Sequence, residues 1–303
     1  MSSVRIVVAA VSGSAPREAG TAMTVSATGQ EGTIGGGELE WRAVTEARAM
    51  LGTEGPRVRR WPLGPELGQC CGGAVTLVFE AVMPQAEHGL ILRRVEGAKP
   101  LPLALRRLQT RARGEGVLPE APVLLDGWLA EAAPRAGRPL WIWGAGHVGR
   151  ALVATLAPLP GLAITWLDTA RDRFPDAIPA GVTLRIAGAE AIEAAPPGAE
   201  HLVLTFSHAL DLEICHRLLT HGVAKAGLIG SETKAARFRS RLRALGHSDA
   251  QILRIACPIG DPALGKHPQA IAVGVAARLL REEAIARDTV EDEARAGARG
   301  ADK

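Results

Sequence analysis

The sequence predicts an α/β protein in which a small N-terminal α/β domain precedes a C-terminal Rossmann-like doubly wound parallel sheet. Strands and helices alternate from Pro139 onward, which is the pattern of parallel βαβ units. Within this region, an apolar strand over residues 140–143 runs into a glycine-rich turn that opens a helix. We therefore expect an N-terminal domain at 1–83, a linker with short helices at 84–137, a Rossmann-like domain at 138–286 and a disordered tail at 287–303.

The composition is that of a soluble globular protein. The 303 residues are 47% hydrophobic and 22% charged, with a net charge of +3. Only 3% are aromatic and none is Tyr, so neither stacking nor charge argues for a nucleic-acid partner. The start lacks a signal-peptide pattern and no apolar run approaches about 18 residues, so we expect no membrane span. Four cysteines without zinc-type spacing indicate reduced thiols in the cytoplasm.

The N-terminal domain is predicted to be a small sheet with one helix. Residues 38–51 place apolar side chains on one face at helical spacing. The β-branched and apolar runs that we expect to form strands cover residues 5–11, 21–26, 31–34, 58–63 and 74–82.

A double cysteine stands in the loop before the last of these strands. The run is Gly68-Gln69-Cys70-Cys71-Gly72-Gly73. Adjacent cysteines are too close for ordinary disulfide geometry. Glycines beside them allow another group to approach closely, and Gln69 adds amide donors and an acceptor. The pair is either two small, half-buried hydrophobes or a soft-ligand or thiol site, and spacing alone leaves both open.

A triple glycine, Gly35-Gly36-Gly37, stands where a strand meets the helix. It is either a bulge or tight packing point, or a set of free amides that binds an anion at a helix N-terminus. Arg17, which follows Ser14 and Pro16, is either a solvated turn residue or a bidentate partner for a phosphate.

The turn Gly144-Ala145-Gly146-His147-Val148-Gly149 has the spacing of a dinucleotide-binding fingerprint. Asp168 ends the next strand, 19 residues after Gly149. In such a unit Gly144, Gly146 and Gly149 allow the tight turn and the approach of a pyrophosphate, while the acidic residue takes ribose hydroxyls. A Rossmann-like core that has kept this turn without a dinucleotide is the competing interpretation.

Further polar residues follow the later strands, at the edge where open α/β sheets bind ligands. They are His208, Asp211 and Ser231, and Lys266 precedes the last helix. Capping or turn chemistry is the alternative for the first three, and Ser231 is expected to cap its helix. Lys266 suits an anion, although an exposed Lys is the commoner outcome.

Several of these motifs, in this order, resemble the xanthine dehydrogenase accessory proteins (the XdhC/CoxI family). The resemblance covers about residues 4–285. The chain departs from the family by beginning almost directly at the first strand, where members usually carry a leading helix, and by a longer, poorly matched stretch between the halves. The motifs concerned are Gly13–Arg17, Gly32–Glu40, Gly68–Gly73, Gly144–Gly149, Asp168, Ser207–Asp211, Leu228–Ser231 and Cys257–Lys266.

The resemblance implies an accessory factor and not an enzyme. Such a protein binds the molybdenum cofactor (molybdopterin) and protects it while a cysteine desulfurase installs its sulfido ligand. It then inserts the cofactor into apo xanthine dehydrogenase or a related molybdenum hydroxylase. The resemblance also implies a homodimer.

The same resemblance suggests which residues would hold that cofactor. A thiolate of Cys71, with Cys70 beside it, suits the soft molybdenum end. Gly35–Gly37 with Arg17, or the Gly144–Gly149 turn, suits the phosphate end. Cys71, Gln69 and the glycine run with Gly72 come first, and His208 and Asp211 next. Which cysteine contacts molybdenum stays open.

Two alternatives from other classes remain. The first is an NAD(P)-dependent oxidoreductase, in which NAD(P) or another nucleotide occupies the Rossmann turn and His208 acts as a general acid. It assigns no role to Gly35–Gly37 or to the double cysteine. The second is a thiol redox sensor at Cys70 and Cys71, which leaves the Rossmann half unexplained.

Overall fold

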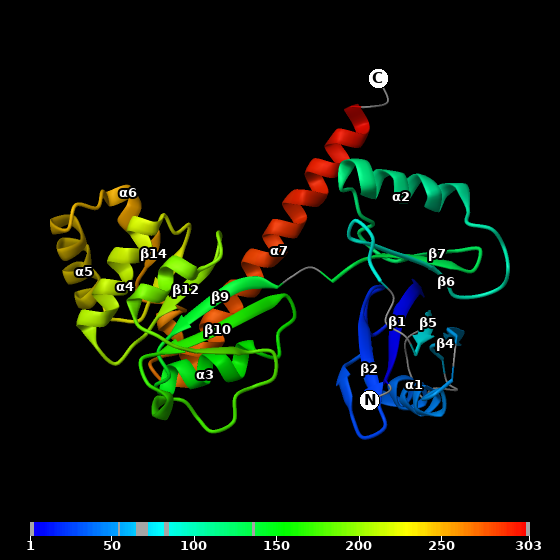
Figure 1. Cartoon of the computed structure of the whole chain (residues 1–303), viewed down its shortest axis with the longest axis horizontal. Helices are drawn as coiled ribbons and strands as arrows, with labels where there is room; N and C mark the ends of the chain where they lie inside the picture. The colour runs from blue at the N-terminus through cyan, green and yellow to red at the C-terminus, as the bar shows by residue number, and fades with distance from the viewer. Residues whose placement is uncertain (1–2, 54, 65–71, 82–84, 135–136, 301–303) are drawn as a thin grey trace. The chain divides into compact units, whose positions relative to one another are not determined.

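The chain divides into two units, Met1–Pro134 and Arg135–Lys303. The computed structural model describes residues 3–53, 55–64, 72–81, 85–134 and 137–300, with side chains as far as residue 285 (Figure 1). The first unit extends beyond residue 83 and includes nearly all of the segment expected to be a linker.

A five-stranded antiparallel sheet with the order β3-β2-β1-β5-β4 forms the first part of this unit. One face of β1 packs against α1, so that Val4, Ile6 and Val8 share a core with Leu39 and Ala43. The elements are β1 (Ser3–Ser12), β2 (Ala22–Ser26), β3 (Gln30–Gly32), α1 (Gly37–Ala49), β4 (Arg57–Pro62) and β5 (Ala74–Glu80). They follow the predicted strands and helix closely.

The segment 85–134 is folded against the opposite face of that sheet, and is not a linker. It forms a three-stranded antiparallel sheet with the order β6-β8-β7, and α2 packs on it. Ala9 and Val78 of the larger sheet share a core with Val95 and Leu129 of the smaller one. The elements are β6 (Leu90–Arg94), α2 (Leu103–Glu115), β7 (Val123–Leu125) and β8 (Trp128–Ala132).

Four charged side chains join the two sheets of this unit. Arg5 of β1 donates to Glu131 of β8 at 2.8 Å and to Glu80 of β5 at 3.2 Å. Arg93 of β6 donates to Glu80 at 2.6 Å and lies 2.7 Å from Glu131. Charged residues in short strands are normally exposed, so the sequence pattern of β6 and β8 does not indicate that they are buried.

The second unit contains a six-stranded parallel sheet with the order β11-β10-β9-β12-β13-β14. This is the strand order of the doubly wound Rossmann fold, so the predicted fold class is confirmed. The strands are β9 (Arg138–Trp143), β10 (Leu162–Asp168), β11 (Thr183–Ile186), β12 (Glu200–Val203), β13 (Ala226–Leu228) and β14 (Ile255–Ala256).

Helices cover both faces of this sheet (Figure 1). Leu140 and Ile142 of β9 face α3 and α7, whereas Trp141 and Trp143 face α4 and α5. The helical elements are α3 (His147–Leu156), η2 (Arg171–Arg173), η3 (Ala189–Ala194), α4 (His208–His221), α5 (Glu232–Ala244), α6 (Asp249–Ile252), η4 (Pro262–Leu264) and α7 (Pro268–Gly300).

Helix α7 continues through most of the segment that was expected to be a disordered tail. This stretch lacks apolar periodicity but is rich in Ala, Glu and Arg, which favour helix by intrinsic propensity. Within the described residues, no helix combines the length and apolar character that a membrane span requires.

Candidate functional site

Three segments that are distant in the sequence meet beside the end of β1. A Cβ on Gly73 would lie 2.2 Å from the backbone oxygen of Ser14, and a Cβ on Gly35 would lie 2.5 Å from the Cβ of Pro16. Only glycine permits approaches this close. The loop after β1, which carries Arg17, therefore touches two of the other glycine motifs.

The double cysteine itself lies outside the described residues. Gln69, Cys70 and Cys71 fall in 65–71, so their predicted roles stay predictions. The chain is described again from Gly72, and the oxygen of Gly73 accepts a hydrogen bond from the Leu63 amide at 2.7 Å. Among the described residues, no three His, Cys, Asp or Glu side chains lie together in a way that could hold a metal ion.

The triple-glycine turn is organised around a carboxylate of its own helix. Glu40 Oε2 accepts from the amides of Ile34 at 2.9 Å and Gly36 at 3.1 Å. The Gly35 amide instead donates to Thr33 Oγ1 at 3.1 Å. One of the two interpretations of the triple glycine requires amides that are free for a phosphate, but side chains already bind those of Gly35 and Gly36. The first turn of α1 also carries Glu38 and Glu40, which disfavours an anion there.

The pKa of Glu40 reflects this arrangement. Burial alone would raise it, but hydrogen bonds from Thr33, Gln30, Gly36 and Ile34 outweigh burial, so the pKa is lowered. The ionised carboxylate thus stabilises the turn above the pKa of an unfolded Glu, and this contribution is lost as the pH falls below it.

Replacing Glu40 by Ala should destabilise the N-terminal unit by about 1 to 2 kcal/mol, because its donors lose their acceptor. Amide hydrogen exchange at Ile34 and Gly36 should accelerate more than exchange in β1. Glu38→Ala is the matched control, since the Glu38 carboxylate accepts from Arg42 on an exposed surface. Unchanged exchange at Ile34 and Gly36 in the Glu40 variant would show that the carboxylate does not hold the turn.

Arg17 stays available near the converging glycines. Its side chain is exposed and has no ion-pair partner among the residues that the structure describes. Its Cγ would lie 3.3 Å from a Cβ on Gly35, which places the residue beside the triple-glycine turn.

In the second unit, the turn after β9 requires glycine at the first and third glycine positions of the predicted fingerprint. Gly144 has a φ of 119°, and a Cβ on it would lie 2.3 Å from the Leu204 oxygen. A Cβ on Gly149 would lie 2.0 Å from the Gly144 oxygen. Around Gly146 there is open space, so this is the position where another molecule could approach the backbone. No acidic residue stands in the first turn of α3.

Asp168, the expected ribose acceptor, already has partners on both oxygens. Its Oδ2 accepts from the Ala145 amide at 2.7 Å, and its Oδ1 accepts from the Thr169 amide at 2.7 Å. Arg173 Nε lies 2.7 Å from Oδ1 as an ion pair, although its N–H is not aligned for a hydrogen bond. The residue is only 5% exposed. As placed, Asp168 closes the turn, with a partner on each oxygen and little of the carboxylate exposed to a ribose.

Asp211 holds the loop after β12 and the start of α5 through hydrogen bonds. It is fully buried, and its Oδ1 accepts from the backbone amide and the hydroxyl of Thr205 at 2.9 and 2.8 Å. Lys234 Nζ donates to Oδ2 at 2.6 Å. His208 is exposed at the start of α4.

The remaining candidates are Ser231 and Lys266. Ser231 caps α5 by accepting from the Lys234 amide at 3.3 Å, so the capping interpretation is confirmed. Lys266 is exposed and contacts no acidic partner within the described ranges. Lys234 and Arg173 cannot be recognised from the sequence, since a single basic residue carries no signal without its spatial partner.

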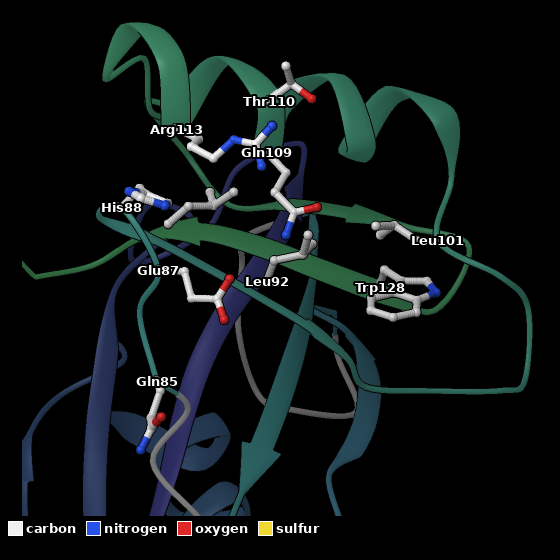
Figure 2. Close-up of a pocket in the computed structure, with 10 residues that line it drawn as sticks. Gln85, Glu87, His88, Leu92, Leu101, Gln109, Thr110, Arg113 and Trp128 are labelled. Atoms are coloured by element: carbon white, nitrogen blue, oxygen red, sulfur yellow. The ribbon is translucent and has the colours of Figure 1, made fainter.

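A cavity of about 540 Å³ lies elsewhere in the first unit, between α2 and the small sheet (Figure 2). None of the residues singled out from the sequence lines it. Figure 2 shows Arg113 and Gln109 on the helix side, with Glu87 and His88 opposite and Leu101 and Trp128 at the far end. Its walls come from the segment that the sequence analysis took for a linker.

Comparisons with known proteins agree with the two-part architecture. A model of the XdhC Rossmann domain matches residues 140–279, and a model of the XdhC and CoxI family matches residues 2–62. Together they cover about two thirds of the chain. The cavity in Figure 2 lies between the two matched segments in the sequence.

Two individual proteins are similar over most of the chain. YqeB of Escherichia coli K12 is 28% identical over 277 residues, which is 89% of this chain and 41% of YqeB. The chain thus spans less than half the length of that relative. A Bacillus halodurans structure described as a xanthine dehydrogenase has a TM-score of 0.61 at 19% identity and covers 92% of this chain and 91% of its own. It supports the fold alone.

Proposed function

Because the chain belongs to the XdhC and CoxI family, we propose that it is a maturation factor that binds the molybdenum cofactor and inserts it into a xanthine dehydrogenase-type hydroxylase. The cofactor is cargo in this role, held and shielded until it is transferred. A cysteine desulfurase would supply the sulfur for its sulfido ligand, and the factor would act as a homodimer.

One observation carries the proposal: the glycine motifs converge at Gly73, which follows the double cysteine in the sequence. Gly73 and the loop at Gly13–Ser14 touch at distances that exclude any side chain. Cys71 is two residues before Gly73 in the sequence. Thiolates are ligands for soft metal centres, and Arg17, which has no ion-pair partner among the described residues, is a cation for an anionic part of the cargo. The residues in this part of the chain therefore fit a cargo with a soft metal at one end and a phosphate at the other.

Protein purified from a host that makes molybdopterin should release a fluorescent pterin on acid oxidation. Cys71→Ala should release much less, because the soft ligand for the metal is gone. Cys257→Ala is the matched control and should match the wild type, since Cys257 lies in the second unit, outside the proposed cargo site. Equal pterin from wild type and Cys71→Ala would remove Cys71 from the site, and absence of pterin from the wild type would remove the cofactor.

The oxidoreductase alternative has less support from the geometry. It requires a free acceptor for the ribose of NAD at the end of β10. Both oxygens of Asp168 are engaged, one by the turn and the other by Thr169 and Arg173. Hydride transfer from NAD(P)H with no bound pterin would favour this alternative.

A further inference from the structure

The side chain of Arg173 lies across the carboxyl end of the central strand of the Rossmann sheet. Strand β9 lies between β10 and β12. Arg173 pairs with Asp168 at the end of β10, and its Cζ lies 3.9 Å from the ring centroid of Phe206, which follows β12. The guanidinium therefore connects the loops on both sides of the glycine turn.

The backbone holds this arginine in place independently of its side chain. The Arg173 oxygen accepts from Arg150 Nη2 at 2.8 Å, and Arg150 Nε donates to the Ala145 oxygen at 3.0 Å. Arg150 belongs to α3, which begins within the glycine turn. The position of Arg173 is thus set by the same residues that set the turn.

The terminal nitrogens of this guanidinium remain unused. No acceptor in the described part of the chain bonds to Nη1 or Nη2 of Arg173, and its side chain is 31% exposed. Phe206 is a large apolar residue that is 61% exposed. A forked set of donors and an aromatic ring thus face solvent together at the edge where such sheets bind ligands.

This chemistry selects a particular class of ligand. A planar guanidinium binds a phosphate through two parallel hydrogen bonds, and a flat ring stacks on an aromatic side chain. A ribose diol, in contrast, is bound by an accessible acidic residue at this position, and Asp168 is buried with a partner on each oxygen. We propose that this edge binds a heteroaromatic ligand that carries a phosphomonoester, and that Arg173 recognises the phosphate. The proposal concerns the selectivity of the second unit and holds whether or not the cargo is the molybdenum cofactor.

Two matched pairs of probes test the proposal on the full chain by calorimetry at a fixed salt concentration. NADP⁺ and NAD⁺ differ by one phosphomonoester, as do neopterin monophosphate and neopterin. We expect the phosphorylated member of at least one pair to bind roughly ten- to a hundredfold more tightly, as for hydrogen bonds to a charged group. The pair that shows the difference identifies the source of the phosphate as a nucleotide or a pterin.

Variants at Arg173 then separate recognition from folding. Arg173→Met should remove the preference within the pair, whereas Arg173→Lys should keep part of it, since the charge remains without the fork. Arg171→Met is the matched control in the same short helix and should keep all of it. Each of three outcomes would overturn the proposal: no probe binds, neither pair shows a preference in the wild type, or the preference survives in both Arg173 variants. The pterin content of the Cys71 variant is a separate readout, so each proposal can fail alone.

Discussion

Replacing Arg5 by Met should lower the free energy of unfolding of the N-terminal unit by about 3 to 5 kcal/mol. Arg5, Glu80 and Glu131 are 8%, 5% and 4% exposed, and the guanidinium of Arg5 bonds to both carboxylates. Without it, two buried carboxylates share the single charge of Arg93. The loss is large because a buried charge that loses its partner keeps its desolvation cost.

Denaturant unfolding of the full chain measures this loss, and hydrogen exchange in β1 and β5 assigns it to the N-terminal unit. Arg59→Met is the matched control, because Arg59 pairs with Glu46 at 2.9 Å and its side chain is 55% exposed. A surface pair of this kind contributes about 1 kcal/mol or less. Equal losses in the two variants would mean that the buried network is not what joins the two sheets.

Acidification from pH 7 to pH 4 should destabilise the C-terminal unit by about 3 kcal/mol through His201 alone. Burial, with a smaller contribution from the charge of His221, lowers the pKa of His201 to about 4. The neutral ring accepts a hydrogen bond from Trp143 Nε1 at 3.1 Å on its Nδ1. The unfolded chain takes up this proton below a pKa of about 6.5, but the folded chain does not until about 4. The contribution of neutral His201 to the free energy of unfolding is therefore fully present above pH 6.5 and is lost as the pH falls toward 4.

His247 should also destabilise the C-terminal unit as the pH falls. Burial, together with the charge of His216, lowers the pKa of His247, whose Nε2 lies 2.7 Å from His216 Nδ1. His201→Gln keeps an acceptor for Trp143 and should flatten the pH dependence of unfolding, whereas His267→Gln, at an exposed position, should not. A wild-type stability that is the same at pH 4.5 and pH 7.5 would contradict the assignment.

The sequence predicted the Rossmann-like unit well because its signals are local. The glycine spacing, the strand before it and the helix after it all lie within residues 140–168. The continuous apolar run at 140–143 indicates a strand that is buried on both faces. The small N-terminal sheet was predictable for the same reason. In each case a strand or helix can be recognised from its own residues, without knowing which elements pack against it in space.

The elements that sequence analysis missed depend on partners distant in the chain. Glu131 of β8 pairs with Arg5 of β1, which lies 126 residues away along the chain. Arg93 of β6 pairs with Glu80 of β5, which also binds Arg5 at a separation of 75 residues. Asp168 stands where the fingerprint places a ribose acceptor, but its oxygens are bound by the Ala145 and Thr169 amides and paired with Arg173, which no motif includes. Glu40 likewise fills a turn that its glycines alone would leave open.

The ion pair between Asp168 and Arg173 also affects competition among ligands. Discrimination between two ligands is a difference of affinities, and it can be achieved by withholding a contact from the unwanted one. A Rossmann edge with a free carboxylate is suited to the ribose of NAD. Here the chain supplies that carboxylate with its own cation, so under our proposal this edge favours a phosphorylated ligand over NAD.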